Sequence, residues 1–119
     1  MKYTEEHLWL REEDDAILIG ISEPGIEEVG EVIFVDLPEV GQTVTKDEEI
    51  IVIESSDSAT DLLAPIDGEV VEVNENLADA PGLLNEDPIG AGWFIKIEAS
   101  DPSQLDDYID EAGYRKFIA

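Results

Sequence analysis

The alternation of apolar and polar positions predicts short strands separated by turns. Residues 16–21 are almost entirely apolar, which indicates a strand buried on both faces. Residues 32–35 form a second apolar run, and residues 49–54 lead into a predicted hairpin. Residues 69–73 alternate with a period of two, which is typical of a half-exposed strand, and residues 93–97 form the last predicted strand. The chain is therefore expected to be mainly β.

Two segments between these strands break the pattern. A short helix is predicted over residues 23–29, where Pro24 suits the first turn although Gly25 weakens it. Residues 74–92 are irregular and contain two turn-forming pairs, Pro81-Gly82 and Asp87-Pro88. A stretch of this length inside a compact domain is usually functional or packed down by its own side chains.

The C-terminal residues change to a helical period. Asp101 is a predicted N-cap, Pro102 suits the first helical position, and Gln104 can close a capping box. Three side chains then share one helix face: Leu105, Tyr108 and Ile109. Gly113 is expected to end this helix, and residues 114–118 to form one further turn packed on the barrel.

The acidic composition limits the partners. Thirty-one acidic residues against six basic ones give the 119-residue chain a formal net charge of −25. This balance excludes nucleic acid and anionic membrane as partners, because binding to either requires Lys and Arg to neutralise phosphate groups. The acidic residues are dispersed along the sequence, so we expect them to coat the surface. Three interpretations stay open: solubility in high salt, steering toward basic partners, and deliberate design.

Length and the remaining composition limit the architecture and the chemistry. The chain is expected to form a single domain, residues 1–119, and to be a monomer. No apolar run is long enough to span a membrane, and the first residues lack the pattern of a signal peptide. The absence of cysteine and the single histidine argue against thiolate and zinc sites. A cytoplasmic protein is expected; the alternative is an organellar matrix protein whose transit peptide has been removed.

The most informative motif is the segment IESSDSATDLLAPIDGEV, residues 53–70. It resembles the lipoyl hairpin of the glycine cleavage system H-protein family, which usually reads similarly to VESVKAASDLYAPVSGEV. The two align without gaps on the Glu-Ser at one end and the Ala-Pro…Gly at the other. The family's lipoyl lysine then falls on Asp57, and a carboxylate cannot form the lipoamide bond.

The resemblance extends over nearly the whole chain. Residues 3–9 (YTEEHLW) match the family's opening YTxxHEW, and residues 30–38 (GEVIFVDLP) match its LGDIVFVELP. Residues 68–74, 84–88 and 92–97 fall in register as well. Each short match is weak alone, but their order and spacing are specific. The chain is therefore identified as a member of the H-protein family.

This resemblance implies a fold and a role. The implied fold is a barrel-sandwich hybrid of the lipoyl/biotinyl-like hammerhead type, with short peripheral helices and a C-terminal helix. Family members are not enzymes. Their lipoyl arm, attached by lipoate ligase, accepts an aminomethyl group from glycine decarboxylase, presents it to the aminomethyltransferase and is reoxidised by dihydrolipoamide dehydrogenase. The implied function is that of an aminomethyl carrier in the glycine cleavage system.

The candidate cofactor site is the position of the family's lipoyl lysine, Asp57. The flanking hairpin residues are Glu54, Ser55, Ser56, Ser58 and Ala59. The small polar residues Ser55, Ser56, Ser58 and Thr60 suit an exposed turn that other proteins approach closely. Because Asp57 has no amine, we expect no lipoate on this chain. The alternative function is a non-lipoylated binding, scaffold or regulatory paralogue, or an engineered variant, that retains the docking surface.

Two further departures lie outside the hairpin. Leu8 stands where the family's HEW has a glutamate near the cleft of the loaded arm, and residues 24–26 replace a Tyr/His-Ala-Gln. Other chemistry is not expected. Glu54, Asp57 and Asp61 carry oxygen ligands for a hard cation, but their spacing matches no EF-hand loop, so no metal site is predicted.

Catalysis by paired carboxylates is not expected either, because a solvated hairpin tip does not raise a carboxyl pKa. We assign no catalytic residue. His7, beside Trp9, is expected to be a packed and hydrogen-bonded structural residue, and Trp9 and Trp93 to belong to the core.

Overall fold

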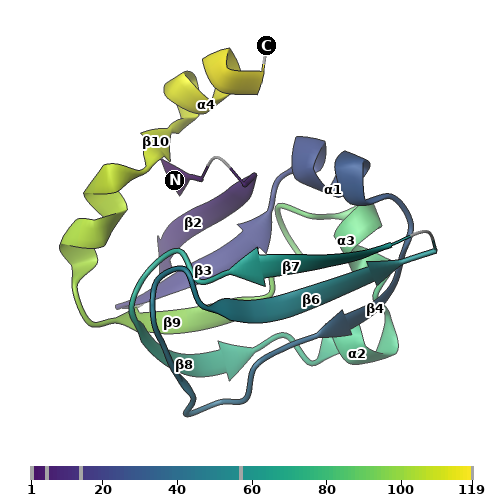
Figure 1. The fold of residues 1–119 in the computed structure, drawn as a ribbon, viewed down its shortest axis with the longest axis horizontal. Helices are drawn as coiled ribbons and strands as arrows, with labels where there is room; N and C mark the ends of the chain where they lie inside the picture. Colours follow the sequence, from purple (N-terminus) through teal and green to yellow (C-terminus); the bar gives the residue numbers. More distant parts are fainter. Residues whose placement is uncertain (1, 5, 14, 57, 119) are drawn as a thin grey trace.

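A computed structural model describes residues 2–4, 6–13, 15–56 and 58–118 of the chain (Figure 1). The strands are β1 (Lys2–Tyr3), β2 (Leu8–Glu13), β3 (Ala16–Ile21), β4 (Val32–Asp36), β5 (Thr43–Val44), β6 (Glu49–Ser55), β7 (Ala59–Leu63), β8 (Gly68–Val73), β9 (Ile95–Ala99) and β10 (Ile109–Asp110). The helices are α1 (Glu23–Val29), α2 (Asn76–Asp79), α3 (Leu83–Glu86), the 3₁₀ helix η1 (Pro102–Asp107) and α4 (Glu111–Ile118).

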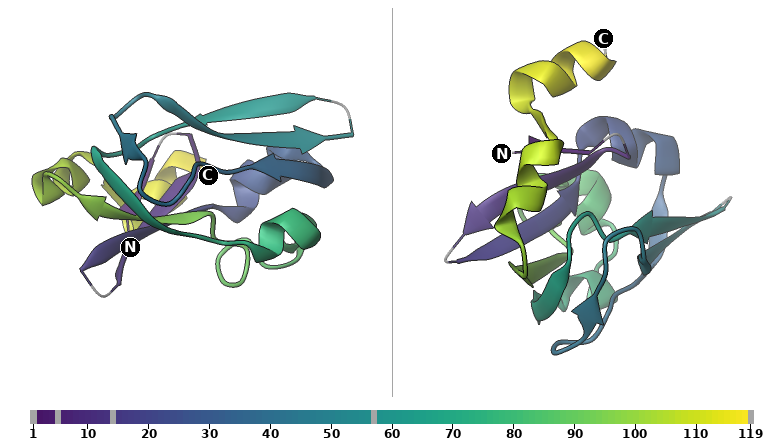
Figure 2. Two further views of the ribbon diagram at one scale, coloured as in Figure 1. Left: turned by 90° about the horizontal axis from the view of Figure 1, so that it is seen from below. Right: turned by 60° about the vertical axis from the view of Figure 1, so that its left-hand side comes forward.

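Within the described residues, the strands form two antiparallel sheets. The larger sheet has seven strands in the order β10-β1-β2-β3-β9-β8-β5, and the smaller has three in the order β4-β6-β7. Figure 2 shows them as two layers, with the β6–β7 hairpin extending beyond the body of the molecule. Buried apolar side chains from both sheets form the larger of two core clusters in the described residues. The mainly β, two-sheet architecture confirms the predicted fold class.

The predicted strand over residues 16–21 is confirmed as β3, in which all six residues are buried. Sequence reasoning missed its neighbour β2, which pairs with β3 along its whole length. The first three residues of β2 are buried, while its end carries Arg11 and two glutamates. These charged residues interrupt the apolar pattern and explain why the strand was missed.

The irregular stretch between residues 74 and 92 is packed down by its own side chains. Leu77 in α2 and Leu84 in α3 are fully buried. Asn74 donates from Nδ2 to the carbonyls of Ala91 and Trp93, each at 2.8 Å. The segment also holds the start of β4, because the backbone N–H of Val32 donates to Asn85 Oδ1 at 3.0 Å.

The predicted C-terminal helix is wrong in its boundaries. Asp101 does cap a helix, but this is the short 3₁₀ helix η1, which ends before Tyr108. Ile109 and Asp110 then form β10, which pairs with β1. Gly113 lies inside α4 instead of ending a helix. Pairing with the edge of the larger sheet interrupts the helical period at this point.

Candidate functional site

The β6–β7 hairpin carries the sequence motif at its tip. Ser55 ends β6 and pairs through its backbone N–H with the carbonyl of Ser58 at 2.8 Å. Its hydroxyl donates to the same carbonyl at 3.1 Å, and the N–H of Ser58 donates to Ser55 Oγ at 3.2 Å. These bonds hold the two ends of the turn together. Asp57, the predicted position of the family's lipoyl lysine, lies outside the described residues.

The described tip residues differ in exposure. Glu54, Ser56, Ser58 and Ala59 are exposed. Ser55 is buried, so the prediction that it is exposed is wrong. Thr60, also predicted to be exposed, is half-buried. The burial of Ser55 follows from strand register, because Ser55 pairs with the buried Val32 of β4. Its hydroxyl remains satisfied by Ser58.

A cavity of about 260 Å³ lies at the opposite end of the hairpin, between the smaller sheet and η1. Its lining includes Thr4, Glu6, Leu8, Lys46, Asp47 and Tyr108. Leu8 is buried in the core and makes this part of the wall apolar. Sequence reasoning did not predict the cavity, because its residues come from separate segments that only the fold brings together.

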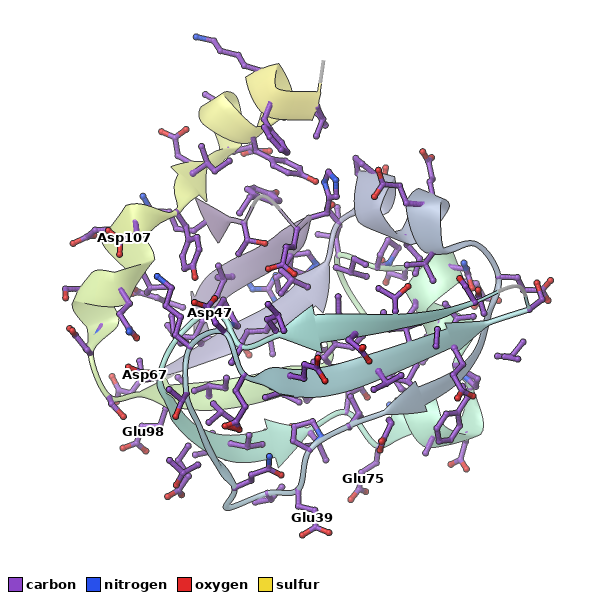
Figure 3. The ribbon with its side chains drawn as sticks, viewed as in Figure 1. Glu39, Asp47, Asp67, Glu75, Glu98 and Asp107 are labelled. Atoms are coloured by element: carbon purple, nitrogen blue, oxygen red, sulfur yellow. The ribbon has the colours of Figure 1, made fainter. Side chains whose placement is uncertain are left out.

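Carboxylates around this cavity are part of a dispersed acidic surface. The carboxylates labelled in Figure 3 come from different loops and elements, and Asp47 and Asp107 lie on the cavity side. Lys46 Nζ lies 3.9 Å from Asp107 Oδ2 and 5.4 Å from the centre of the Tyr108 ring. The dispersal agrees with the sequence prediction of an acidic coat.

Tyr108 is the most perturbed titratable group of the cavity. Its hydroxyl donates to the carbonyl of Pro65. Burial, followed by the negative charges of Asp47, Asp107 and Glu6, raises the pKa of Tyr108 to about 12. The neutral phenol is therefore the form that the fold favours.

We expect Tyr108 to make the stability of the chain sensitive to alkali. A folded-state pKa of about 12 lies above the ordinary value of 10.0, so its contribution is present below pH 10 and is lost as the pH rises toward 12. Tyr108→Phe should remove the highest-pH step from the tyrosine absorbance titration and flatten the fall in melting temperature across this range. An unchanged titration curve in the variant would contradict this assignment.

His7 is a hydrogen-bonded structural residue, as predicted. Its Nδ1 lies 2.7 Å from the hydroxyl of Tyr114, which in turn lies 2.5 Å from Ser22 Oγ. Its Nε2 lies 3.7 Å from a carboxylate oxygen of Glu28. Gly25 packs nearby, since a Cβ there would lie 2.7 Å from the Cβ of His7. This contact explains the glycine that weakens the helix signal.

The lysines of the chain lie away from the hairpin tip. Lys96 in β9 lies between two carboxylates, at 3.5 Å from Glu13 and 3.6 Å from Glu72. Lys46 contacts Asp107 and Tyr108, Lys2 lies in β1, and Lys116 lies in α4. The sequence from residue 49 to residue 63 contains no lysine.

The described residues hold neither a metal-binding cluster nor a membrane-spanning helix. Among them, no group of three or more His, Asp or Glu side chains is arranged to hold a metal ion. No helix in the described part of the chain is long and apolar enough to cross a membrane.

The fold and the hairpin motif define a protein of the lipoyl-carrier class, and comparisons with known proteins identify its family. The family model for the glycine cleavage H-protein matches residues 1–119. The glycine cleavage system H proteins of Thermotoga maritima and Xanthobacter autotrophicus are 47% and 46% identical to this chain. Each alignment covers 99% of this chain, and 95% and 94% of the respective relatives.

Similarity to a solved structure supports the same family. The crystal structure of a glycine cleavage system H protein from Mycobacterium marinum superposes with a TM-score of 0.87 at 32% identity, covering 97% of this chain and 93% of that one. This chain belongs to the glycine cleavage H-protein family. Proteins of this family are lipoyl carriers and not enzymes, which confirms the non-enzyme prediction.

Proposed function

We propose that this chain is an H-protein-type partner of the glycine cleavage enzymes that docks on them without carrying lipoate. The proposal rests on Asp57, which the resemblance of the hairpin sequence puts at the family's lysine position. A lipoamide bond requires a primary amine, and an aspartate side chain has none. The residues present therefore do not fit covalently attached lipoate.

The other lysines support the same conclusion. Lys96 is held between two carboxylates on a sheet, with its side chain only 19% exposed. Lys46 lies beside Asp107, away from the tip, and Lys2 and Lys116 belong to the terminal elements β1 and α4. Lys46 lies on a tight turn of its own, closed by the bond from the N–H of Glu48 to the carbonyl of Thr45, but it is half-buried there and lines the cavity.

The proposed partners are those of the family: the aminomethyltransferase, glycine decarboxylase, dihydrolipoamide dehydrogenase and lipoate ligase. A single domain over residues 1–119, a monomeric state and a cytoplasmic location belong to this proposal. The net charge of −25 favours encounter with basic surfaces and opposes contact between two copies of the chain.

The chain's own residues supply docking rather than chemistry in this role. The Ser55–Ser58 bonds hold the ends of the turn, so the tip stands on a rigid hairpin base. Exposed carboxylates such as Glu54 and Asp61 lie beside it and attract Lys or Arg of a partner. Attraction between exposed charges is screened by salt, so binding should weaken as ionic strength rises.

Competition with an authentic carrier tests this function. Added to a glycine cleavage assay built from Escherichia coli enzymes and lipoylated E. coli H protein, the chain should inhibit turnover competitively at low salt. It should support no turnover when it replaces that H protein, even after incubation with lipoate ligase, lipoate and ATP. Turnover with this chain as the sole H protein would overturn the proposal, as would the absence of inhibition at low salt.

A further inference from the structure

The edge strand β4 carries an irregularity next to the hairpin tip. Val32 pairs with Ser55 and Phe34 pairs with Glu54, so Ile33 is an extra residue between two neighbouring pairs. This is a β-bulge, which re-aims side chains and breaks the alternation of a strand. As a result Ile33 and Phe34 are both exposed, at 55% and 50%, although they follow each other in the sequence.

Strand register places Phe34 on the outer face of the smaller sheet. Directly paired residues of antiparallel strands project to the same face. Phe34 pairs with Glu54, which pairs with Ala59, and all three are exposed. The intervening row, in which Val35 pairs with Ile53, is buried and faces the core.

The next row of paired residues on the outer face of the smaller sheet adds two carboxylates. Asp36 pairs with Val52, and Val52 pairs with Asp61. Asp36 and Asp61 are exposed and Val52 is half-buried. The outer face therefore mixes apolar and acidic side chains. Glu54 and Val52 lie on the central strand β6, with Phe34 and Asp36 of β4 on one side and Ala59 and Asp61 of β7 on the other. The sequences of β4, β6 and β7 contain no lysine or arginine.

We propose that this outer face is a docking surface for a protein whose own surface combines an apolar pocket with Lys or Arg side chains. The inference rests on the proposed docking function and assigns that docking to named residues. Phe34 is the anchor, because a large exposed aromatic side chain gains most from entering a pocket on a partner. The carboxylates attract the partner's cations beside it: Glu54 is paired with Phe34, Asp36 lies two residues along β4, and Asp61 lies on the far strand β7.

The negative charge of the chain favours a basic protein over a second copy of the chain, anionic lipid or nucleic acid. A second copy of the chain would bring the same carboxylates against these, and each copy carries a net charge of −25. Anionic lipid and nucleic acid meet the same repulsion. A basic protein surface with an apolar pocket is the partner that satisfies the carboxylates and Phe34 together.

The test compares two phenylalanines of equal exposure. Phe34 is 50% exposed, and Phe117 in α4 is 49% exposed on an element away from the hairpin tip (Figure 1). With the E. coli aminomethyltransferase as probe, calorimetric titration at low salt should show that Phe34→Ser weakens binding about tenfold or more. Phe117→Ser should leave the dissociation constant within about twofold of the parent chain.

A second variant keeps the test independent of folding. Asp36→Asn combined with Asp61→Asn leaves Phe34 in place and should lower the association rate and flatten its salt dependence. If the parent chain binds but both variants bind equally well, this assignment fails while the docking function stands. If the parent chain does not bind at low salt, both fail. Sedimentation showing dimers through this face would also overturn the choice of occupant.

Discussion

Replacing Asp57 with lysine should change the chain from one that accepts no lipoyl group to one that accepts a single group. The substitution supplies the missing amine within a hairpin that otherwise matches the family motif. The turn ends are already joined by Ser55 and Ser58, and the neighbours Glu54 and Ala59 are exposed. After incubation with lipoate ligase, lipoate and ATP, intact mass spectrometry should show one added lipoyl group on Asp57→Lys and none on the parent chain.

Two controls separate amine chemistry from charge and position. Asp57→Arg makes the same change of charge without a primary amine, so its mass should stay unchanged. Ser56→Lys places an amine one residue away on the same turn, and it should be modified less than Asp57→Lys if the ligase reads the position. An unmodified Asp57→Lys would contradict the view that the amine alone is missing. A lipoylated parent chain would overturn the interpretation of Asp57.

Much of the fold could be predicted because strong local patterns coincide with tertiary structure. The apolar run of residues 16–21 became the buried strand β3, and Ser22 and Pro24 lie at the start of the predicted helix α1. The C-terminal segment could not be predicted in the same way. There, pairing of Ile109 and Asp110 with β1 is a contact between the two ends of the chain, which no local pattern encodes.

The candidate site was likewise only partly predictable from the sequence. The hairpin motif located the tip and its flanking residues, because ordered sequence matches fix positions without any knowledge of packing. The outward placement of Phe34 could not be predicted, since residues 32–35 read as a continuous apolar strand. It depends on the bulge opposite Glu54 and Ser55, which is a property of the pairing between two strands.

Trp9 in the larger sheet is linked by hydrogen bonds to the segment that holds the start of β4. The buried indole of Trp9 donates from Nε1 to the carbonyls of Ile21 at 3.1 Å and Pro88 at 3.0 Å. Pro88 belongs to the segment whose Asn85 accepts from Val32 at the start of β4. The position of Trp9 is therefore linked through this segment to the strand that carries the proposed docking anchor.

Gly20→Ala should consequently unfold the chain at a much lower temperature. Gly20 pairs directly with Trp9, and a Cβ at Gly20 would lie 2.3 Å from two atoms of the indole ring. Because hydrogen bonds at both carbonyls hold the ring, it cannot move aside without losing them, and overpacking of this kind costs about 3 kcal/mol. For a chain of this size that corresponds to a fall in melting temperature on the order of 10 °C.

Gly82→Ala is the matched control, since a Cβ there meets nothing within 4 Å, and it should melt at or above the parent temperature. The melting temperatures are measured by circular dichroism. Equal values for the two variants would contradict the prediction that a Cβ at Gly20 clashes with the Trp9 ring.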